Sequence, residues 1–477
     1  MANAAAPDPR GWAAPAILVV GAVTALRVAA LWLSPTDLFV DEAQYWLWAQ
    51  GPAFGYYSKP PMIAWVIALS TLGSDAPFWV RLPAPLLHAA TALILGRGAA
   101  GLWGAAAGAW TAAVWVTLPM TAVASFMIST DTVMFPFLAL ALLAWLAVLG
   151  GGGRVAALAA GACLGLAALG KYAALYYLLA AGVAAFWPAY RPRGREALAA
   201  LAALLAVLGP NLVWNLLNGL ATIQHTLDNA DWVRDPQTQA GLHPLEWLTF
   251  LLEQFAVFGP VMAGGLVWLG LTLRGRAQRV RLLAGVALGI VLLVSVQALL
   301  SRAYANWAAS AYVAGTLAVV VALPTAWRTA SVAANAALCL LVAFAVAWPE
   351  RLPGPLAEGM DRYGGRAAMS RAILAEAEAR GLGTVVASDR DILADLFYTG
   401  RDRGIAFRAL AGPGRAENHY ELAYPYGAGP GRVLFVTRPD TLPACDGAEP
   451  LGPLEALGYW RDRPRALWSV PGDCWAP

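Results

Sequence analysis

The chain has 477 residues, of which 59% are hydrophobic and only 13% are charged, and its formal net charge is +3. So few charges over this length exclude an ordinary soluble protein and indicate an integral membrane protein. The near-neutral balance also argues against nucleic acid as a partner.

Eleven apolar runs are long enough to cross a bilayer. They cover residues 13–33, 79–97, 101–119, 132–149, 155–170, 172–189, 196–214, 247–273, 282–300, 306–324 and 329–348. The first run is not followed by a small-residue cleavage site, so we expect it to remain as a span.

Basic residues between the runs predict the orientation. With eleven spans, one side carries Arg10, Arg97, Arg154, Arg191, Arg274 and Arg328. The positive-inside rule makes that side cytoplasmic. The outer side then holds the loops 34–78 and 215–246 and everything after residue 348. Carboxylates gather on this side, namely Asp37, Asp41, Glu42, Asp75, Asp131, Asp228, Asp231, Asp235 and Glu246.

The acidic pair Asp41-Glu42 opens a predicted interfacial helix over 41–50. On this helix Asp41, Tyr45 and Trp48 share one face, so Asp41 could act as a catalytic carboxylate. The alternative is that Asp41 caps the helix and Glu42 complements its dipole.

The segment Tyr56-Tyr57-Ser58-Lys59-Pro60-Pro61 precedes a second short helix, predicted over 61–72. The prolines prevent helix at Lys59 and suit a helix start just after it. A lysine on such a rigid loop suits a lipid phosphate, with Tyr57 beside it for the substrate. The alternative is a lysine that reaches toward lipid headgroups.

Three further outer positions carry candidate residues. Arg81 lies at the outer end of the second long run, where it either binds an anion or anchors the chain. Asp131 follows Ser129-Thr130, so helix capping competes with a substrate-facing role. The turn after residue 300 carries Arg302, Tyr304 and Asn306, which either anchor the interface or bind phosphate and sugar.

The loop 215–246 contains His225 and Asp228, which could share a helical face. A divalent metal is therefore conceivable there, although any solvated loop carries such residues.

After residue 349 the composition changes to that of a small α/β domain covering 349–477. We predict helices over 366–381 and 390–398 and buried strands over 384–388 and 433–437. Cys445 and Cys474 could form a disulfide in an oxidising compartment.

Asp41-Glu42, Lys59-Pro60-Pro61, Arg81-Leu82-Pro83 and Asp131, in this order, resemble the polyprenyl-phosphate-sugar-dependent glycosyltransferases of the GT-C fold. This superfamily includes protein O-mannosyltransferases and bacterial enzymes that add aminoarabinose or galacturonic acid to lipid A. The resemblance covers residues 1–215 well. It implies an all-α polytopic membrane domain over 1–348, with about 11 transmembrane helices, and an extracytoplasmic α/β domain.

The same resemblance implies an inverting transfer of a sugar from a polyprenyl (undecaprenyl) monophosphate to an envelope acceptor. That acceptor would be lipid A or lipopolysaccharide, another glycan or a protein, at the periplasmic face of the bacterial inner membrane, with the N-terminus cytoplasmic. Asp41, with Glu42 beside it, would be catalytic, and Lys59, Arg81 and Arg302 would bind the donor phosphate.

No cofactor is expected to be required. In aminoarabinose transferases an acidic metal ligand precedes the lysine of the Lys-Pro-Pro turn, whereas this chain has Ser58. No glycine-rich nucleotide loop is present either, which fits a lipid-linked donor.

A flippase or transporter of lipid-linked sugars is the alternative function. Such a protein would place ionisable residues along a pathway in mid-span, and Arg27 is the main residue of that kind. A non-catalytic scaffold would leave the Asp-Glu and Lys-Pro-Pro motifs unexplained.

Overall fold

The computed structural model describes residues 10–229, 241–412, 414–443 and 445–475. Asp231 and Asp235 of the predicted outer loop lie outside the described residues. Two compact units are formed. The membrane unit comprises the residues up to Trp32, Ala53–Val66 and Arg81–Phe344, and the sheet unit comprises Leu33–Pro52, Ile67–Val80 and the residues from Ala345 onward.

Helices make up the membrane unit. Those within it are α1 (Ala13–Leu33), α5 (Pro83–Trp103), α6 (Ala105–Thr117), α7 (Pro119–Ala124), α8 (Thr130–Leu149), α9 (Gly153–Gly170), α10 (Tyr176–Ala184), α11 (Gly194–Leu217), α12 (Ala221–Asn229), α13 (Pro244–Phe258), α14 (Pro260–Leu271), α15 (Gln278–Leu300) and α16 (Ala311–Ala322). The helices α3 (Met62–Ser70), α4 (Pro77–Arg81) and α17 (Thr325–Ala347) continue into the sheet unit.

The prediction of a helical, polytopic architecture is confirmed, since each of the eleven apolar runs is largely helical. The number of eleven spans is not confirmed. Among the described helices, seven are long and apolar enough to cross a membrane, or up to eight if one bent pair counts as a span. The three remaining runs form shorter helices at 105–117, 172–184 and 311–322, and a bilayer core needs about 20 helical residues.

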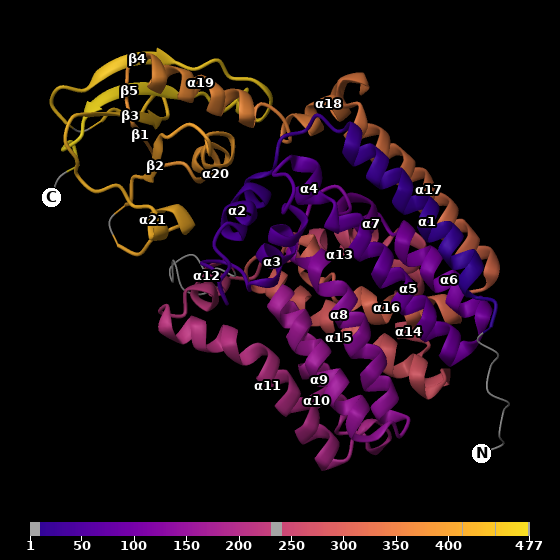
Figure 1. Cartoon of the computed structure of the whole chain (residues 1–477). Coiled ribbons are helices and arrows are strands. Elements are labelled where there is room, and N and C mark those ends of the chain that lie inside the picture. The colour runs from indigo at the N-terminus through magenta and orange to yellow at the C-terminus, as the bar shows by residue number, and fades with distance from the viewer. Residues whose placement is uncertain (1–9, 230–240, 413, 444, 476–477) are drawn as a thin grey trace. The chain divides into compact units, whose positions relative to one another are not determined.

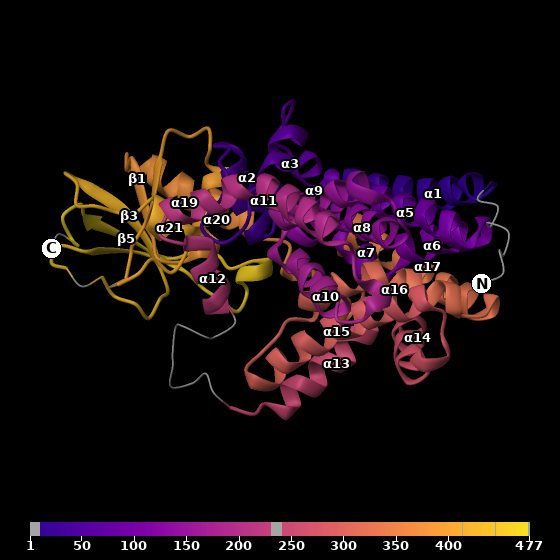
Figure 2. The same cartoon turned by 90° about the horizontal axis from the view of Figure 1, so that it is seen from below.

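The bent pair is α13 and α14, which meet at 118° (Figure 2). Its corner is Gly259-Pro260. Gly259 has φ 86°, a left-handed conformation that suits glycine, and Pro260 has no N–H to continue the hydrogen bonding of α13. The sequence therefore turns the chain sharply within an apolar run that was predicted to be one span.

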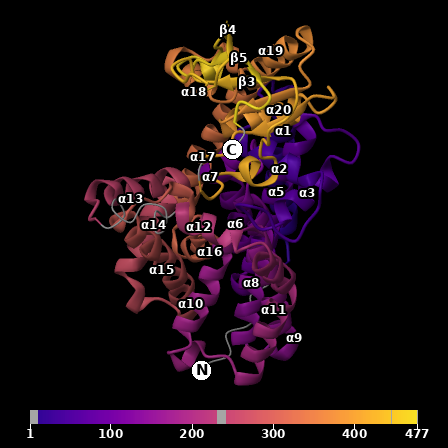
Figure 3. The same ribbon diagram turned by 90° about the vertical axis from the view of Figure 1, so that its left-hand side faces the viewer.

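The helices α8, α9 and α11 pack side by side (Figure 3). Small residues allow this close approach. A side-chain carbon placed on Gly161 of α9 would lie only 1.9 Å from the carbonyl oxygen of Ala200 on α11. This three-helix layer carries several of the polar residues described below at one end.

The sheet unit contains a five-stranded mixed sheet in the order β2-β1-β3-β5-β4 (Figure 1). Its strands are β1 (Thr384–Ala387), β2 (Ala406–Ala409), β3 (Arg432–Thr437), β4 (Glu449–Pro453) and β5 (Ala466–Pro471). Its helices are α2 (Val40–Ala49), α18 (Gly354–Asp361), α19 (Arg366–Ala379), α20 (Arg390–Thr399) and α21 (His419–Ala423). The predicted small α/β domain is confirmed, and β1, β3, α19 and α20 match the four predicted elements.

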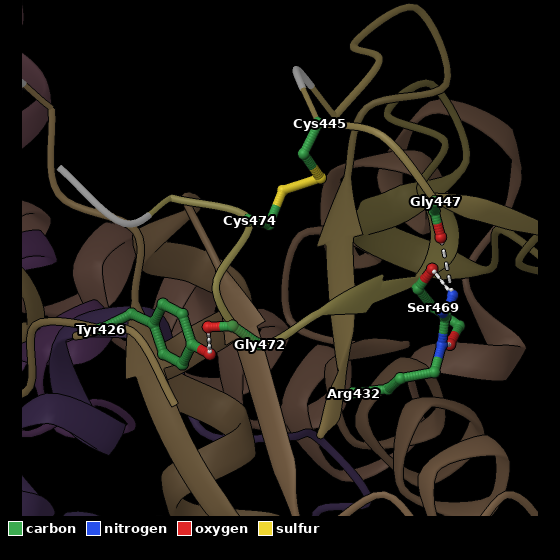
Figure 4. The surroundings of a disulfide bond; sticks show 7 residues. All are labelled: Tyr426, Arg432, Cys445, Gly447, Ser469, Gly472 and Cys474. Atoms are coloured by element: carbon green, nitrogen blue, oxygen red, sulfur yellow. Dashed lines mark hydrogen bonds between the residues drawn. A yellow bond between two sulfur atoms is a disulfide. The ribbon is translucent and has the colours of Figure 1, made fainter. Parts of the chain in front are cut away.

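β1 pairs in parallel with both β2 and β3, whereas β5 runs antiparallel to β3 and β4. A disulfide joins Cys445 and Cys474, with Cα atoms 5.3 Å apart (Figure 4). Nearby, the hydroxyl of Tyr426 donates to the carbonyl of Gly472 at 2.7 Å. The C-terminal segment is thus tied to the sheet by both a covalent bond and a hydrogen bond.

Residues from the first predicted outer loop complete the sheet unit. The backbone N–H of Arg366 donates to the carboxylate of Asp37 at 2.9 Å. The indole of Trp46 donates to Asp75 at 2.7 Å, and the ring of Trp46 lies edge-on to that of Tyr398 on α20. The α/β domain therefore uses chain from 33–52 and 67–80 as well as from the C-terminal region.

Candidate functional site

Lys59 lies on a tight turn of the membrane unit. The N–H of Tyr56 donates to the carbonyl of Lys59 at 3.2 Å, which closes the turn. Pro60 and Pro61 are buried, whereas Lys59 is partly exposed. α3 begins at Met62, directly after the prolines, as the sequence predicted.

Two helices hold this turn in place. The side-chain amide of Asn211 on α11 donates to the carbonyl of Phe54 at 2.6 Å. The hydroxyl of Thr222 on α12 donates to the carbonyl of Tyr56 at 2.7 Å. These backbone anchors fix the path of the chain that carries Lys59.

Side-chain packing adds to these anchors. The ring of Tyr57 lies 5.1 Å from that of His225. Gly55 faces Trp214 of α11 so closely that a side-chain carbon on Gly55 would lie 2.2 Å from the indole. Glycine is therefore required for this approach, and the loop is pre-organised by its contacts.

A buried ion pair lies at one end of α8 and α9. The ammonium of Lys171 donates to both carboxylate oxygens of Asp131 at 2.8 Å, and the amide of Asn306 donates to Asp131 at 3.1 Å. The Lys171 and Asp131 side chains are 20% and 10% exposed. The hydroxyl of Ser129 caps α8 by accepting from the N–H of Thr132 at 3.3 Å, so Asp131 itself is left for the ion pair.

The structure thus brings together Asp131 and Asn306, which the sequence singled out separately. It adds Lys171, which lies between the apolar runs 155–170 and 172–189 and was not among the candidate residues. The signal that could have found it is a lysine between two apolar runs on the same predicted side as Asp131, since a charge there needs a partner.

A second polar group links the next residue of the chain to the Lys59 turn. Tyr172 follows Lys171 directly, and its hydroxyl donates to Asn211 at 2.7 Å and accepts from Asn215 at 3.1 Å. Asn211 also holds the carbonyl of Phe54. These hydrogen bonds run from Tyr172 to the loop that carries Lys59, and the backbone joins Tyr172 to the ion-paired Lys171.

The other predicted cations have different surroundings. Arg81 is only 3% exposed and ends α4. Arg302 is exposed, and its guanidinium lies 5.9 Å from the ring centre of Tyr304. Tyr304 in turn packs against Trp307 at 5.7 Å.

Asp41 lies in the sheet unit and pairs with Arg390 at 2.5 Å. Arg390 also donates to the side chain of Gln44 at 2.9 Å. Burial alone would lower the pKa of Arg390, but the charge and hydrogen bond of Asp41 raise the pKa above its ordinary value. Sequence reasoning missed Arg390, which lies 349 positions away along the chain.

Glu42, in contrast, is fully buried, and its carboxylate accepts from the N–H of Phe39 at 3.0 Å. α2 begins at Val40, and the carboxylate of Glu42 accepts the backbone N–H of Phe39 at the N-terminus of this helix. The alternative that Asp41 caps the helix is wrong. Of the acidic pair, only Asp41 has a side chain accessible to substrate, at 44% exposure.

Aromatic groups surround the same face of α2. The rings of Tyr45 and Trp48 lie 5.4 Å apart, and His419 lies edge-on to Trp48 at 5.5 Å. Burial and the nearby charge of Arg390 lower the pKa of His419 to about 4. His419 is therefore neutral at physiological pH.

His225 and Asp228 both lie on α12. Within the part of the chain that the structure describes, no group of three or more His, Cys, Asp or Glu side chains could hold a metal ion. Ser58, which directly precedes Lys59, is buried and contributes no carboxylate.

Sequence and structure comparisons place these features among known proteins. Residues 58–214, which include the Lys59 turn and the Asp131–Lys171 pair, match the family described as dolichyl-phosphate-mannose-protein mannosyltransferase. The lipid A galacturonosyltransferase RgtD of Rhizobium johnstonii is 38% identical over 472 residues, which cover 97% of this chain and 99% of that protein.

Two crystal structures of ArnT from Cupriavidus metallidurans share the fold. The apo structure has a TM-score of 0.62 at 15% identity and covers 97% of this chain and 98% of the other. The structure bound to undecaprenyl phosphate has a TM-score of 0.64 at 16% identity, with 97% and 99% covered.

Proposed function

Since this chain belongs to the polyprenyl-phosphate-sugar-dependent glycosyltransferases of the GT-C fold, we propose that it transfers galacturonic acid to lipid A. The donor would be galacturonic acid linked to undecaprenyl phosphate. The name of the 38% identical relative supports both the sugar and the acceptor, and the ligand of the similar ArnT structure supports the lipid carrier. The observation that carries the proposal is the rigidly anchored Lys59 turn.

In this reaction the bond between the anomeric carbon and the phosphate oxygen breaks as an acceptor oxygen attacks. The leaving group is a phosphate monoester, so it needs stabilisation of negative charge more than it needs a proton. Lys59 would supply that charge at a fixed position, with Arg81 and Arg302 as further cations. A pre-organised cation costs little reorganisation when the charge develops.

Asp41 would act on the acceptor. If the attacking group is a hydroxyl, the carboxylate would take its proton, and attack opposite the leaving phosphate would invert the anomeric carbon. If the attacking group is a phosphate, no base is needed and Asp41 would position the acceptor. Arg390 would hold the carboxylate in one orientation in either case.

We also propose that transfer needs no divalent metal. The donor set supports this proposal, because Ser58 replaces an acidic ligand and the described residues offer no three-ligand group. We further propose a location at the bacterial inner membrane, with a cytoplasmic N-terminus and a periplasmic sheet unit. The arginines between the apolar runs support this orientation. The Cys445–Cys474 disulfide supports an oxidising compartment.

The proposal is tested with purified protein in lipid nanodiscs, labelled undecaprenyl-phosphate-galacturonic acid and lipid A. We expect transfer by the wild type to fall roughly a hundredfold or more in Lys59→Ala and Asp41→Asn. The Arg403→Ala variant, which removes an exposed ion pair with Glu378, serves as the control. A chelator should change the rate less than twofold, and an absence of transfer by folded wild type would contradict the proposal.

The transporter alternative depends on Arg27. This residue is 1% exposed and donates to the carbonyl of Val116 at 2.7 Å and to the sulfur of Cys339 at 3.5 Å. Thr121 donates to the same carbonyl at 3.1 Å, near the break between α6 and α7 at Pro119. Arg27 therefore donates a hydrogen bond to a backbone carbonyl beside a helix break. This contact favours a structural role for Arg27 over a place on a transport pathway.

A further inference from the structure

A large cavity lies within the sheet unit. Its volume is about 1020 Å³, at the upper end of the usual range for ligand pockets. The segments that follow β1 and β3 line it, at Ser388–Asp391 and Thr437–Thr441, together with α21 and the segment before β5.

The topology of the sheet explains why a cavity forms there. β1 and β3 are parallel neighbours, but the chain after β1 leads through α20 to β2, whereas the chain after β3 leads toward β4 and β5. The two connections diverge at the carboxyl ends of adjacent parallel strands. Such a switch point is where open α/β sheets bind ligands.

Fixed donors and acceptors face this cavity. Arg465 is only 5% exposed; its guanidinium pairs with Asp389, and its Nε has no hydrogen-bond partner. Asp391 accepts from the hydroxyl of Tyr459 at 2.6 Å. These contacts hold the arginine and the two carboxylates in fixed positions at the cavity wall.

The chemistry of the walls selects the class of ligand. Four arginines and six carboxylates share the lining with Asn, Ser and Thr, and none of the described aromatic side chains contributes. Asp389 caps α20 by accepting from the N–H of Asp391 at 2.8 Å, so a carboxylate occupies the helix terminus where a free phosphate would bind. Interleaved donors and acceptors suit a polyhydroxylated sugar, whose hydroxyl groups both donate and accept.

We infer that this cavity binds the saccharide head group of the acceptor. Arg390 both lines the cavity and pairs with Asp41, so a sugar held there would lie beside the proposed acceptor carboxylate. This inference rests on the proposed function, because it assigns the acceptor subsite of that reaction. It gives the sheet unit the task of recognising the sugar backbone.

The test measures binding as well as transfer. Arg438 and Asp440 line the cavity from exposed positions after β3, so replacing both is compatible with folding. The probe is the water-soluble, deacylated glucosamine disaccharide of lipid A, titrated by calorimetry against full-length protein in detergent. We expect Arg438→Ala/Asp440→Ala to weaken binding at least tenfold and to raise the acceptor KM similarly, with the donor KM within twofold of wild type.

Arg403→Ala, at an exposed ion pair with Glu378, is the matched control and should bind and react as the wild type does. If the double variant transfers sugar with the disaccharide affinity and acceptor KM of the wild type, the inference is overturned and the proposed function stays intact. If the wild type binds the disaccharide and the double variant does not, but the wild type transfers sugar from no donor, the cavity assignment is supported and the proposed function is refuted. An absence of disaccharide binding to the wild type would overturn the inference.

Discussion

Single buried charges determine much of this molecule's chemistry. Asp131 is hydrogen-bonded to Lys171 and Asn306, and removal of Lys171 leaves its largely buried carboxylate without a compensating charge. Breaking a buried pair typically costs 3–5 kcal/mol, whereas removing both charges costs much less. This asymmetry separates a structural role of the pair from a functional one.

We therefore expect Lys171→Met to lower the free energy of unfolding by roughly 3 kcal/mol. Lys171→Met/Asp131→Asn should recover most of that loss. Thermal unfolding of the purified protein in detergent, read as Tm, measures both. Equal Tm values for the single and the double variant would show that the ion pair does not carry the stability. If the double variant is stable but inactive, the pair also serves catalysis.

Asp395 makes the sheet unit sensitive to pH. Burial raises its pKa to about 6, against a smaller opposing contribution from the hydroxyl of Ser370. The folded state therefore binds more protons than the unfolded state between about pH 4 and 6, so this group's contribution to stability falls as pH rises through that window.

Asp395→Asn should consequently stabilise the sheet unit at pH 7, by roughly 3 kcal/mol, and the difference from wild type should vanish near pH 4. Hydrogen exchange of the α20 amides in the full chain measures this local stability. His419→Gln should show the opposite pH dependence, because burial lowers the pKa of His419 to about 4. The contribution of His419 to the stability of the sheet unit is therefore lost as pH falls. A pH-independent difference for Asp395→Asn would contradict the assignment.

At the scale of elements, local sequence signals predicted short structures well. The helices at 41–50 and 61–72 appear as α2 and α3, and Pro60-Pro61 precede the first residue of α3. β1 and β3 are continuous apolar runs typical of buried parallel strands. β2, β4 and β5 were missed although they are no shorter than β1. Arg408 interrupts the apolar residues of β2, Ser469 interrupts those of β5, and β4 contains prolines and a glycine that sequence reasoning assigns to turns.

The candidate site was predicted only in part, for a physical reason. Asp41, Lys59 and Asp131 were found from local motifs. Arg390 and Lys171, which pair with Asp41 and Asp131, and Asn211, which holds the loop before Lys59 through Phe54, lie far away along the chain. Partners brought together by tertiary folding leave no local pattern. The break at Gly259-Pro260, in contrast, was visible in the sequence but was read as part of a continuous span.

The Lys59 turn gives a prediction at this scale. A methyl group at Gly55 would collide with Trp214, so Gly55→Ala should displace the loop and lower transfer at least tenfold. Gly73→Ala is the matched control, because a side-chain carbon there meets no atom within 4 Å. Transfer rates are compared at equal amounts of folded protein, and an active Gly55→Ala enzyme would show that the close approach is dispensable.

At the scale of the whole molecule, the disulfide should contribute to the stability of the sheet unit. Cys445 and Cys474 are 29 positions apart, and closing such a loop stabilises by roughly 3–4 kcal/mol. Cys445→Ser/Cys474→Ser should lower Tm, and peptide mapping without reduction should find these two cysteines linked in the wild type. Free thiols at both positions in protein isolated from the envelope would contradict the assignment.

The shared use of early and late chain in the sheet unit also governs its biosynthesis. Asp41 and Arg390 are 349 positions apart, and translation proceeds at roughly 5–20 residues per second, so α2 waits on the order of 20–70 s for α20. During that interval the buried faces of Trp46 and Trp48 have no partner from the later chain. The carboxylate of Asp41 thus acquires its arginine only after nearly all of the membrane helices have been made, which delays assembly of this part of the enzyme until synthesis is almost finished.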